Sequence, residues 1–174
     1  PAEGVGVVGV SETLDIPRAT FEADEIAAAH ERLRKHPEPQ WIDRERNYVD
    51  IAWAFDALLC DLAEDFAANP TYPYEVQAFR IGDMAVVGLK GEPFVEGQLD
   101  IKGYSPSPRT LVAHLCNGYL GYLPTRTAAE RFSYNFYDDE GRAVRRGATR
   151  LVLVPDAMDR VLASARGLLD TLWA

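Results

Sequence analysis

The stretch that decides the fold spans residues 80–96 and reads RIGDMAVVGLKGEPFVE. Its centre, Met84–Leu89, is an apolar run of strand length. Gly82-Asp83 has the composition of a two-residue hairpin loop, so the run should pair with a preceding strand that begins near Val76. The stretch therefore predicts an antiparallel hairpin at the heart of a sheet.

The second half of the same stretch delivers Glu92 to the end of that strand. Gly91 permits a sharp turn, and Pro93 suits the first position of a helix that runs to about Lys102. Ligands gather beyond the carboxyl ends of strands, and a carboxylate near a helix N-terminus gains roughly 0.3–1 kcal/mol from the dipole. Glu92 is thus a candidate ligand or base, although capping of the helix is the commoner role for such a glutamate.

Helical and strand-like patterns alternate on both sides of this stretch. Helices are expected where apolar residues recur at helical spacing: Ala23–His36, Tyr48–Phe66 and a last helix that Asp156 caps and that runs through Leu172. Further strands are expected at Leu14–Pro17, Thr110–Cys116 and Ala148–Val154, and an exposed hairpin at Tyr134 and Phe136 with its turn at 138–141. The pattern predicts an α/β (α+β) fold, a mixed β-sheet covered by helices. Residues 1–174 would form a single domain or one half of a larger one.

Composition narrows the class of protein. The chain has 174 residues, 47% hydrophobic and 26% charged, as in a globular protein that is soluble. No apolar run reaches eighteen residues, so no transmembrane segment is expected. A net charge of -9 disfavours nucleic acid as a partner. We see no signal peptide, and the compartment, cytoplasmic or secreted, stays open. A chain that begins with Pro1 has been processed or is a piece of something longer.

Common catalytic signatures do not occur in this sequence. There is no Gly-x-Ser-x-Gly, phosphate-binding Gly-rich loop or HExxH motif. His30, His36 and His114 form no metal signature, and Cys60 and Cys116 are most simply small buried hydrophobes. The chemistry must therefore come from a different kind of site.

A polar and aromatic cluster follows the strand expected at Thr110–Cys116. Tyrosines at this density are typical of a functional surface, either a pocket wall or an interface. They are equally typical of a structural position at the border of the core. The cluster comprises Asn117, Gly118, Tyr119, Tyr122, Pro124, Thr125, Arg126 and Tyr134.

Three blocks in this order resemble the neutral/alkaline non-lysosomal ceramidase family and its shorter bacterial relatives. The blocks are Ile81–Glu96, Ser105-Pro106 and Asn117–Arg126, which reads NGYLGYLPTR. The resemblance extends loosely from about Leu14 to the final helix. It covers most of this chain but only the C-terminal half of the family's catalytic domain.

The resemblance implies a zinc ion held by two histidines, a glutamate and a tyrosine. It would assign the glutamate to Glu92 and the tyrosine to Tyr134, with Tyr137 as the alternative. Neither zinc histidine matches a histidine of this chain. They, the catalytic serine and the other substrate contacts would lie in the missing N-terminal half of the domain, which would be the partner of this chain. Substrate contacts in this chain would come from Asn117, Tyr119, Tyr122 and Arg126.

On this resemblance the full protein would be a zinc-dependent amide hydrolase of sphingolipid metabolism. Its substrate would be a ceramide-like lipid or a smaller N-acyl amide, attacked by a metal-activated water. The isolated chain would be inactive. Two alternatives remain: a non-catalytic ceramidase-like binding module without metal, and an interaction fragment whose apolar surface pairs with the missing half or with a second copy as a homo-oligomer.

Overall fold

The computed structural model describes residues 6–131, 135–137, 143–145 and 151–174. The body of the molecule is built on strands β1 (Val7–Pro17), β4 (Thr71–Ile81), β5 (Met84–Leu89) and β7 (Arg109–Ala113). They form one sheet in the order β1-β4-β5-β7. The remaining elements are α1 (Ala23–Lys35), β2 (Trp41–Asp43), β3 (Tyr48–Val49), α2 (Ile51–Ala68), β6 (Glu92–Pro93), α3 (Val95–Tyr104), β8 (Tyr122–Leu123), α4 (Arg126–Arg131), β9 (Asn135–Tyr137), β10 (Ala143–Arg145) and α5 (Ala157–Trp173).

The sheet is mixed, as the sequence predicts. β4 runs antiparallel to both of its neighbours, β1 and β5, and the β4–β5 hairpin closes where Ile81 pairs with Met84 around Gly82, which has φ 61°. The chain then crosses through α3 and returns as β7, parallel to β5. The predicted α/β (α+β) fold is therefore confirmed, and the hairpin turn lies where Gly82-Asp83 placed it.

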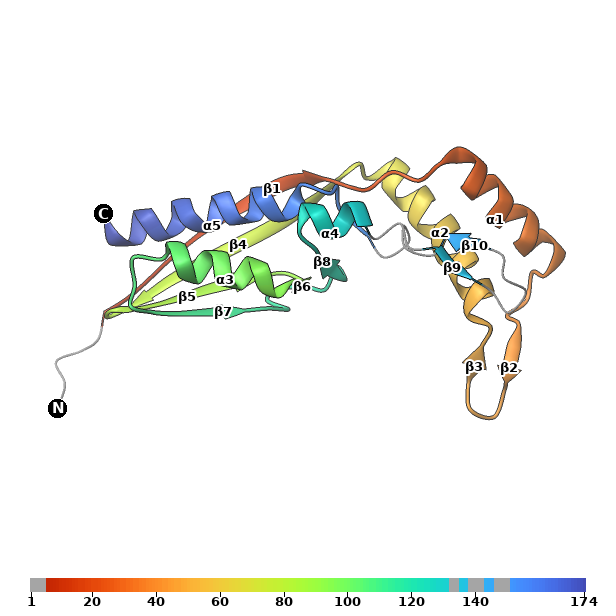
Figure 1. Ribbon diagram of the computed structural model, residues 1–174, viewed down its shortest axis with the longest axis horizontal. Helices are drawn as coiled ribbons and strands as arrows, with labels where there is room; N and C mark the ends of the chain where they lie inside the picture. The colour runs from red at the N-terminus through yellow and green to blue at the C-terminus, as the bar shows by residue number, and fades with distance from the viewer. Residues whose placement is uncertain (1–5, 132–134, 138–142, 146–150) are drawn as a thin grey trace.

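The core lies between the sheet and helices α3 and α5, which pack on the same face of it (Figure 1). Alternation along each strand selects the inward residues: Val76 and Ala78 of β4 and Val87 and Leu89 of β5 are fully buried. Leu169 of α5 is buried against them, as the helical spacing in this segment predicts.

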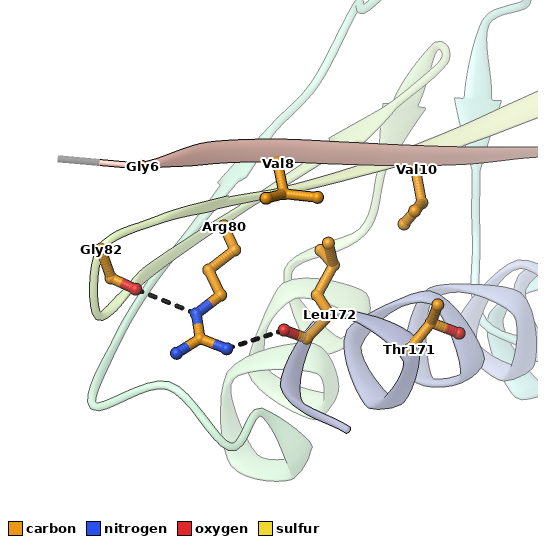
Figure 2. Close-up of a pocket in the computed structure, with 7 residues that line it drawn as sticks. All are labelled: Gly6, Val8, Val10, Arg80, Gly82, Thr171 and Leu172. Atoms are coloured by element: carbon orange, nitrogen blue, oxygen red, sulfur yellow. Dashed lines mark hydrogen bonds between the residues drawn. The ribbon is translucent and has the colours of Figure 1, made fainter. Parts of the chain in front are cut away.

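Arg80 ties the end of α5 to the sheet. Its Nε donates to the carbonyl of Gly82 at 3.0 Å, and its Nη1 donates to the carbonyl of Leu172 at 2.9 Å (Figure 2). The latter is one of the carbonyls that a helix end leaves without a partner, so Arg80 caps α5. Its guanidinium also lies 4.8 Å from the ring centroid of Trp173, and it forms one wall of a cavity of about 420 Å³.

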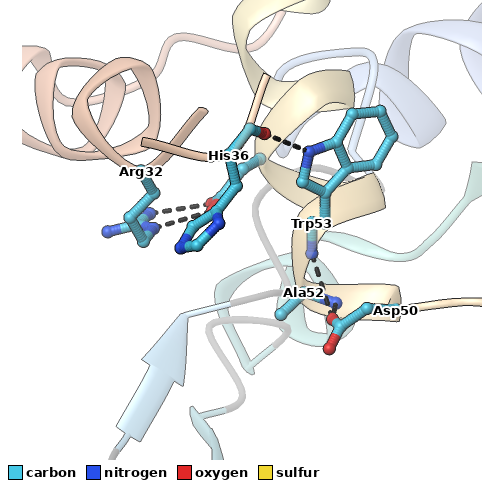
Figure 3. A network of polar contacts seen from close by, with 6 residues as sticks. Arg32, His36, Asp50, Ala52 and Trp53 are labelled. Atoms are coloured by element: carbon cyan, nitrogen blue, oxygen red, sulfur yellow. Dashed lines mark hydrogen bonds and ion pairs between the residues drawn. The ribbon is translucent and has the colours of Figure 1, made fainter. Parts of the chain in front are cut away.

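An arm of two helices, α1 and α2, extends from the far end of the body (Figure 1). Its own core is small, with Ala29, Leu59 and Cys60 buried and Phe21 and Leu33 against them. Polar contacts close the arm. Arg32 pairs with Asp56 at 2.7 Å. Trp53 Nε1 donates to the carbonyl of His36 at 2.8 Å (Figure 3). Asp50 caps α2 by accepting from the backbone of Ala52 and Trp53.

Several predicted boundaries are wrong. Pro93 does not begin a helix, because Glu92–Pro93 form the strand β6 and α3 starts at Val95. Tyr48 lies in β3, so α2 begins three residues later at Ile51. Asp156 precedes α5 but makes no capping bond, since its carboxylate pairs with Arg160 at 2.9 Å.

Two strands also differ from their predicted extents. The strand predicted at Leu14–Pro17 is much longer and begins at Val7. The strand predicted to be buried at Thr110–Cys116 is the sheet edge Arg109–Ala113, where Leu111 is exposed.

The last predicted segments are described only in part. β9 and β10 pair antiparallel, so the predicted hairpin forms, while Tyr134 and the turn at 138–141 lie outside the described residues. Of the strand predicted at Ala148–Val154, residues 148–150 lie outside the described part of the chain, and in residues 151–154 only Leu153 forms a bridge, to Arg18, so a strand of the predicted length does not form there. Within the described ranges, no helix is long and apolar enough to cross a membrane.

Candidate functional site

The candidate site lies where β5 and β7 end side by side. Because the two strands are parallel, their carboxyl ends meet at one edge of the sheet, with Gly88 opposite Ala113. The segments that follow them, residues 90–94 and 114–123, therefore share this edge. Such an edge is the usual place for a ligand in a sheet of this kind.

Main-chain hydrogen bonds lock the two segments together. Leu115 N donates to the carbonyl of Gly91 at 2.9 Å, and Gly91 N donates to the carbonyl of Gly118 at 3.2 Å. Glu92 N then bonds the carbonyl of Gly121 at 2.9 Å, and β6 continues alongside β8 with Glu92 opposite Tyr122. Two of the sequence blocks noted above thus pair residue by residue.

Both segments hold residues in the left-handed region of backbone space. Gly91 has φ 65°, and a Cβ on it would lie 2.7 Å from the carbonyl oxygen of Gly121. Leu115 and Asn117 adopt φ 57° and 56° although they carry side chains. A left-handed residue costs roughly 1–2 kcal/mol, and such strain concentrates at functional sites. The backbone alone marks this edge as a candidate site.

Glu92 and Tyr119 face each other in the site. Glu92 is half-buried in β6, and Tyr119 is 67% exposed in the loop after β7. The nearby negative charge of Glu92 raises the pKa of the Tyr119 phenol above its ordinary value of 10.0. At neutral pH the phenol is therefore protonated and able to donate to the carboxylate.

Tyr122 and Asn117 complete the neighbourhood of that pair. The ring of Tyr122 meets Phe94 edge-on at 6.3 Å between centroids, which gives the site an aromatic side. Asn117 Nδ2 donates to Glu75 Oε2 at 3.0 Å across from β4. The structure therefore brings Asn117, Tyr119 and Tyr122 to the same edge as Glu92.

The other two predicted site residues lie differently. Arg126 begins α4, and its guanidinium donates to Asp159 of α5 at 2.7 Å and 3.0 Å. Tyr134 lies outside the described residues, and for Tyr137 only its place in β9 is described. The roles predicted for these residues stay predictions.

Sequence reasoning did not single out Lys90, Tyr72 or Glu75. Lys90 Nζ donates to the carbonyl of Pro73 at 3.1 Å and lies 5.3 Å from the ring centroid of Tyr72. Tyr74, buried beneath it, holds the Lys90 carbonyl with its hydroxyl at 2.8 Å. Lys90 comes directly after the apolar run Met84–Leu89, so its place at the carboxyl end of that strand could have been predicted from the sequence. Tyr72 and Glu75 carry no such signal, because their place depends on pairing far along the chain.

The described residues do not by themselves make a metal site. No three His, Cys, Asp or Glu side chains among them lie close enough together to share an ion. His30 is exposed on α1, His36 follows its end, and His114 is exposed just after β7. A catalytic zinc takes three protein ligands, so Glu92 would need partners from beyond these residues.

Comparison with known proteins gives a partial likeness in fold. No protein-family model matches the chain, and no curated protein matches its sequence. A solved structure described as ceramidase complexed with C2 is similar over 57% of this chain and 15% of that chain, with 17% identity and a TM-score of 0.43. The neutral ceramidase from Pseudomonas aeruginosa is similar over 95% of this chain and 29% of that chain, with 13% identity and a TM-score of 0.46.

This chain therefore spans less than a third of either solved chain. Identities and scores of this size establish neither a shared family nor a shared activity.

Proposed function

We propose that this chain supplies Glu92 as a metal-binding carboxylate to a zinc-dependent amide hydrolase of the neutral ceramidase type. The observation that carries the proposal is the β6–β8 pairing, which places Glu92 opposite Tyr122 at the strained edge of the sheet. Two blocks that resemble the ceramidase family in sequence thereby form one site. Zinc, when bound, would polarise an amide carbonyl and lower the pKa of its water.

The residues of this chain have separate tasks in the proposal. Glu92 would hold the ion, and the protonated phenol of Tyr119 would orient the Glu92 carboxylate by a hydrogen bond. The aromatic pair of Tyr122 and Phe94 would bound an apolar part of the substrate, such as the acyl chain of an N-acyl amide. Tyr134, or Tyr137 in its place, and two histidines from the remainder of a larger catalytic domain would complete the ligand set.

Metal content tests the proposal directly. Zinc is measured on the natural gene product and on its Glu92→Gln variant, and amidase activity is followed on an N-acyl amide. We expect about one zinc per molecule in the natural protein, as a single catalytic site requires, and loss of both zinc and activity in the variant. Glu96→Gln is the matched control, because Glu96 carries the same carboxylate on the exposed start of α3. Unchanged zinc in Glu92→Gln would contradict the proposal.

A second candidate is an interaction module without metal, and the uncovered face of the sheet favours it. The helices that pack on the sheet in the described part of the chain lie on one face. On the other, Leu111 is 56% exposed and Phe79 lies flat over Gly9, where a Cβ would come within 2.7 Å of the ring. The occupant would be the remainder of the same larger domain. Absence of zinc from the natural protein would favour this candidate.

A further inference from the structure

We propose that strand β1 is a self-association surface, to which a second copy of this chain adds its own β1 in the antiparallel direction. β1 is an outer strand of the sheet, whose order is β1-β4-β5-β7 (Figure 1). It pairs with β4 through all eleven of its residues, without a shift of register. Its other side therefore offers a long, regular row of backbone groups, which is the feature that another strand recognises.

Hydrogen bonds at the two ends of β1 show which residues turn their backbone toward this free edge. Gly82 N donates to the carbonyl of Gly6 at 3.1 Å. Arg18 N donates to the carbonyl of Pro70 at 2.9 Å. Bonding alternates along an antiparallel strand, so the even-numbered residues bond toward β4. The N–H and C=O groups that point outward belong to the odd-numbered residues Val7, Gly9, Ser11, Thr13 and Asp15.

The last part of the same edge is already paired, in agreement with this alternation. Ala19 N donates to the carbonyl of Val152 at 3.0 Å, and Val154 N donates to the carbonyl of Pro17 at 3.1 Å. Both Pro17 and Ala19 are odd-numbered, as the alternation requires. In the part of the chain that the structure describes, the outward backbone groups of residues 7–15 make no hydrogen bond.

The open part of the edge carries few of the features that keep other strands away from a monomer. Residues 7–16 contain no proline, lysine or arginine, and the pairing with β4 shows no bulge. Val7 and Val8 are 64% and 55% exposed. The charged side chain of Glu12 is held toward α5, since its carboxylate accepts from the Ser164 hydroxyl at 2.5 Å. An edge of this kind is expected to pair with another strand.

The cavity beside β1 shows where a second strand would add apolar contacts. Val8 and Val10 point toward Leu172 at the end of α5, and these residues line the cavity of about 420 Å³ together with Arg80 (Figure 2). Gly6 lines it as well, and a Cβ on Gly6 would meet no atom within 4 Å. A strand laid along the edge would bring side chains into this open space.

A two-fold axis through Val10 gives the register that fits these observations. In an antiparallel pair of identical strands, the residue on the axis faces its own copy. Val10 then faces Val10, a β-branched pair that stabilises a sheet, and Glu12 faces Val8 of the second copy. Leu14 of the second copy would lie beside Gly6, next to the cavity. No acidic residue within residues 7–13 faces another acidic residue.

The neighbouring registers are less favourable. An axis at Glu12 would set two carboxylates against each other. An axis at Ser11 would run the second strand into Val154, which already bonds Pro17. An axis at Gly9 would shorten the paired stretch and place two glycines at its centre, where they have no side chains to pack.

Sedimentation velocity on the natural gene product, over a range of protein concentrations, tests the inference. We expect an equilibrium between monomer and dimer. The dimer should become stronger at high salt, because each copy of this chain carries a net charge of -9 and salt screens the repulsion between the copies. Circular dichroism verifies that each variant is folded.

Val8→Glu and Val8→Lys test the register by opposite charges at the same position. Glutamate at position 8 would face Glu12 of the second copy at two places in the dimer, so the dissociation constant should rise about tenfold. Lysine would face the same carboxylate, so Val8→Lys should dimerise at least as strongly as the unmodified protein. Val95→Glu is the matched control, because Val95 is 56% exposed on α3 and should leave association unchanged.

Val10→Cys gives a readout of geometry that does not depend on affinity. Val10 bonds toward β4, so two copies would face each other at a position without hydrogen bonds between them, about 4.5 Å apart between Cα atoms. This distance allows a disulfide. Mild oxidation should link two copies of Val10→Cys and leave Thr13→Cys unlinked, because Thr13 lies away from the axis. The unmodified protein controls for Cys60 and Cys116.

Four results would overturn the inference. The first is a monomer at every concentration, which would mean that another segment covers the edge, such as the remainder of a larger domain. The others are equal effects of Val8→Glu and Val8→Lys, equal effects of Val8→Glu and Val95→Glu, and a disulfide in Thr13→Cys but not in Val10→Cys. Glu92→Gln should not alter association, so failure of this inference is distinguishable from failure of the proposed function.

Discussion

The helix-covered core and the loops at the carboxyl edge of the sheet are adjoining parts of the same strands, yet they are built differently. In the core, Val87 and Leu89 of β5 are completely buried in regular strand geometry. Two residues later, Gly91 adopts φ 65°, and in the facing loop Leu115 and Asn117 are left-handed as well. Within a few residues the backbone therefore changes from a regular, buried strand to loops that contain left-handed residues and exposed tyrosines.

This difference means that the core determines the stability of the fold, whereas the loops determine the shape of the candidate site. Burial of apolar area is the main favourable term in folding, and it is concentrated between the sheet and α5. The loops expose Tyr119 and Tyr122 to solvent and hold unfavourable backbone angles, so they depend on the core for their shape. A change in the core should therefore alter the folding equilibrium, and a change in the loops should alter the site.

Leu169→Ala should give the largest effect. Leu169 is fully buried on α5, and removal of its side chain leaves a cavity, so the free energy of unfolding should fall by about 3 kcal/mol. Urea denaturation followed by circular dichroism measures this loss. Leu99→Ala makes the same chemical change on the exposed side of α3, where it should cost less than about 0.5 kcal/mol. Equal losses in the two variants would show that α5 does not cover the core as described.

Gly91→Ala should have a smaller effect on stability but a direct effect on the site. A Cβ at Gly91 would lie 2.7 Å from the Gly121 oxygen and 2.9 Å from Leu120 Cγ, and the positive φ adds its own cost. The expected loss is about 2 kcal/mol in the same urea experiment. Because Gly121 must move, the register between Glu92 and Tyr122 should also be disturbed.

Gly103→Ala is the control for that change. Gly103 lies in α3, and a Cβ there would meet no atom within 4 Å. Alanine favours a helix over glycine by up to about 1 kcal/mol, so this variant should be neutral or slightly more stable. If Gly91→Ala behaved in the same way, the tight approach of the two loops would be refuted.

The sequence predicts the core better than it predicts the edge, because the signals of the core are local. The Gly82-Asp83 turn and the helical spacing of α1 and α5 each lie within one short segment, and all three elements form. Glu92–Pro93 form a strand only because Tyr122–Leu123 lie alongside, thirty residues further on. Local preference for proline at a helix start could not show this pairing. The β2–β3 hairpin was missed for another reason, since strands of two or three residues are too short to display alternation.

The candidate site was predictable in part for the same reason. Glu92 is visible from the turn that precedes it, and the cluster from Asn117 to Tyr122 from its density of tyrosines. The approach of Tyr119 to Glu92 and of Asn117 to Glu75 depends on the parallel alignment of β5 with β7. No spacing along the chain encodes those contacts.

The contact between Tyr119 and Glu92 gives the smallest predicted effect and the most specific one. The chain has eight tyrosines, so the titration of Tyr119 is obtained as the difference in ultraviolet absorbance between the unmodified chain and Tyr119→Phe as pH rises. Glu92 favours the neutral phenol, so Tyr119 should ionise at a pH above the ordinary pKa of 10.0. Glu92→Gln removes the charge, and the pKa should fall back toward that value.

Both side chains are accessible at the edge, so the shift should change while the free energy of unfolding at neutral pH stays nearly constant. Glu96→Gln removes a carboxylate from the first turn of α3 and should leave the Tyr119 titration where it is. Leu169→Ala should also leave it in place while the protein remains folded, although it lowers stability the most. A titration that moved with Leu169→Ala and not with Glu92→Gln would mean that the core, and not the loop contact, sets the electrostatics of the site.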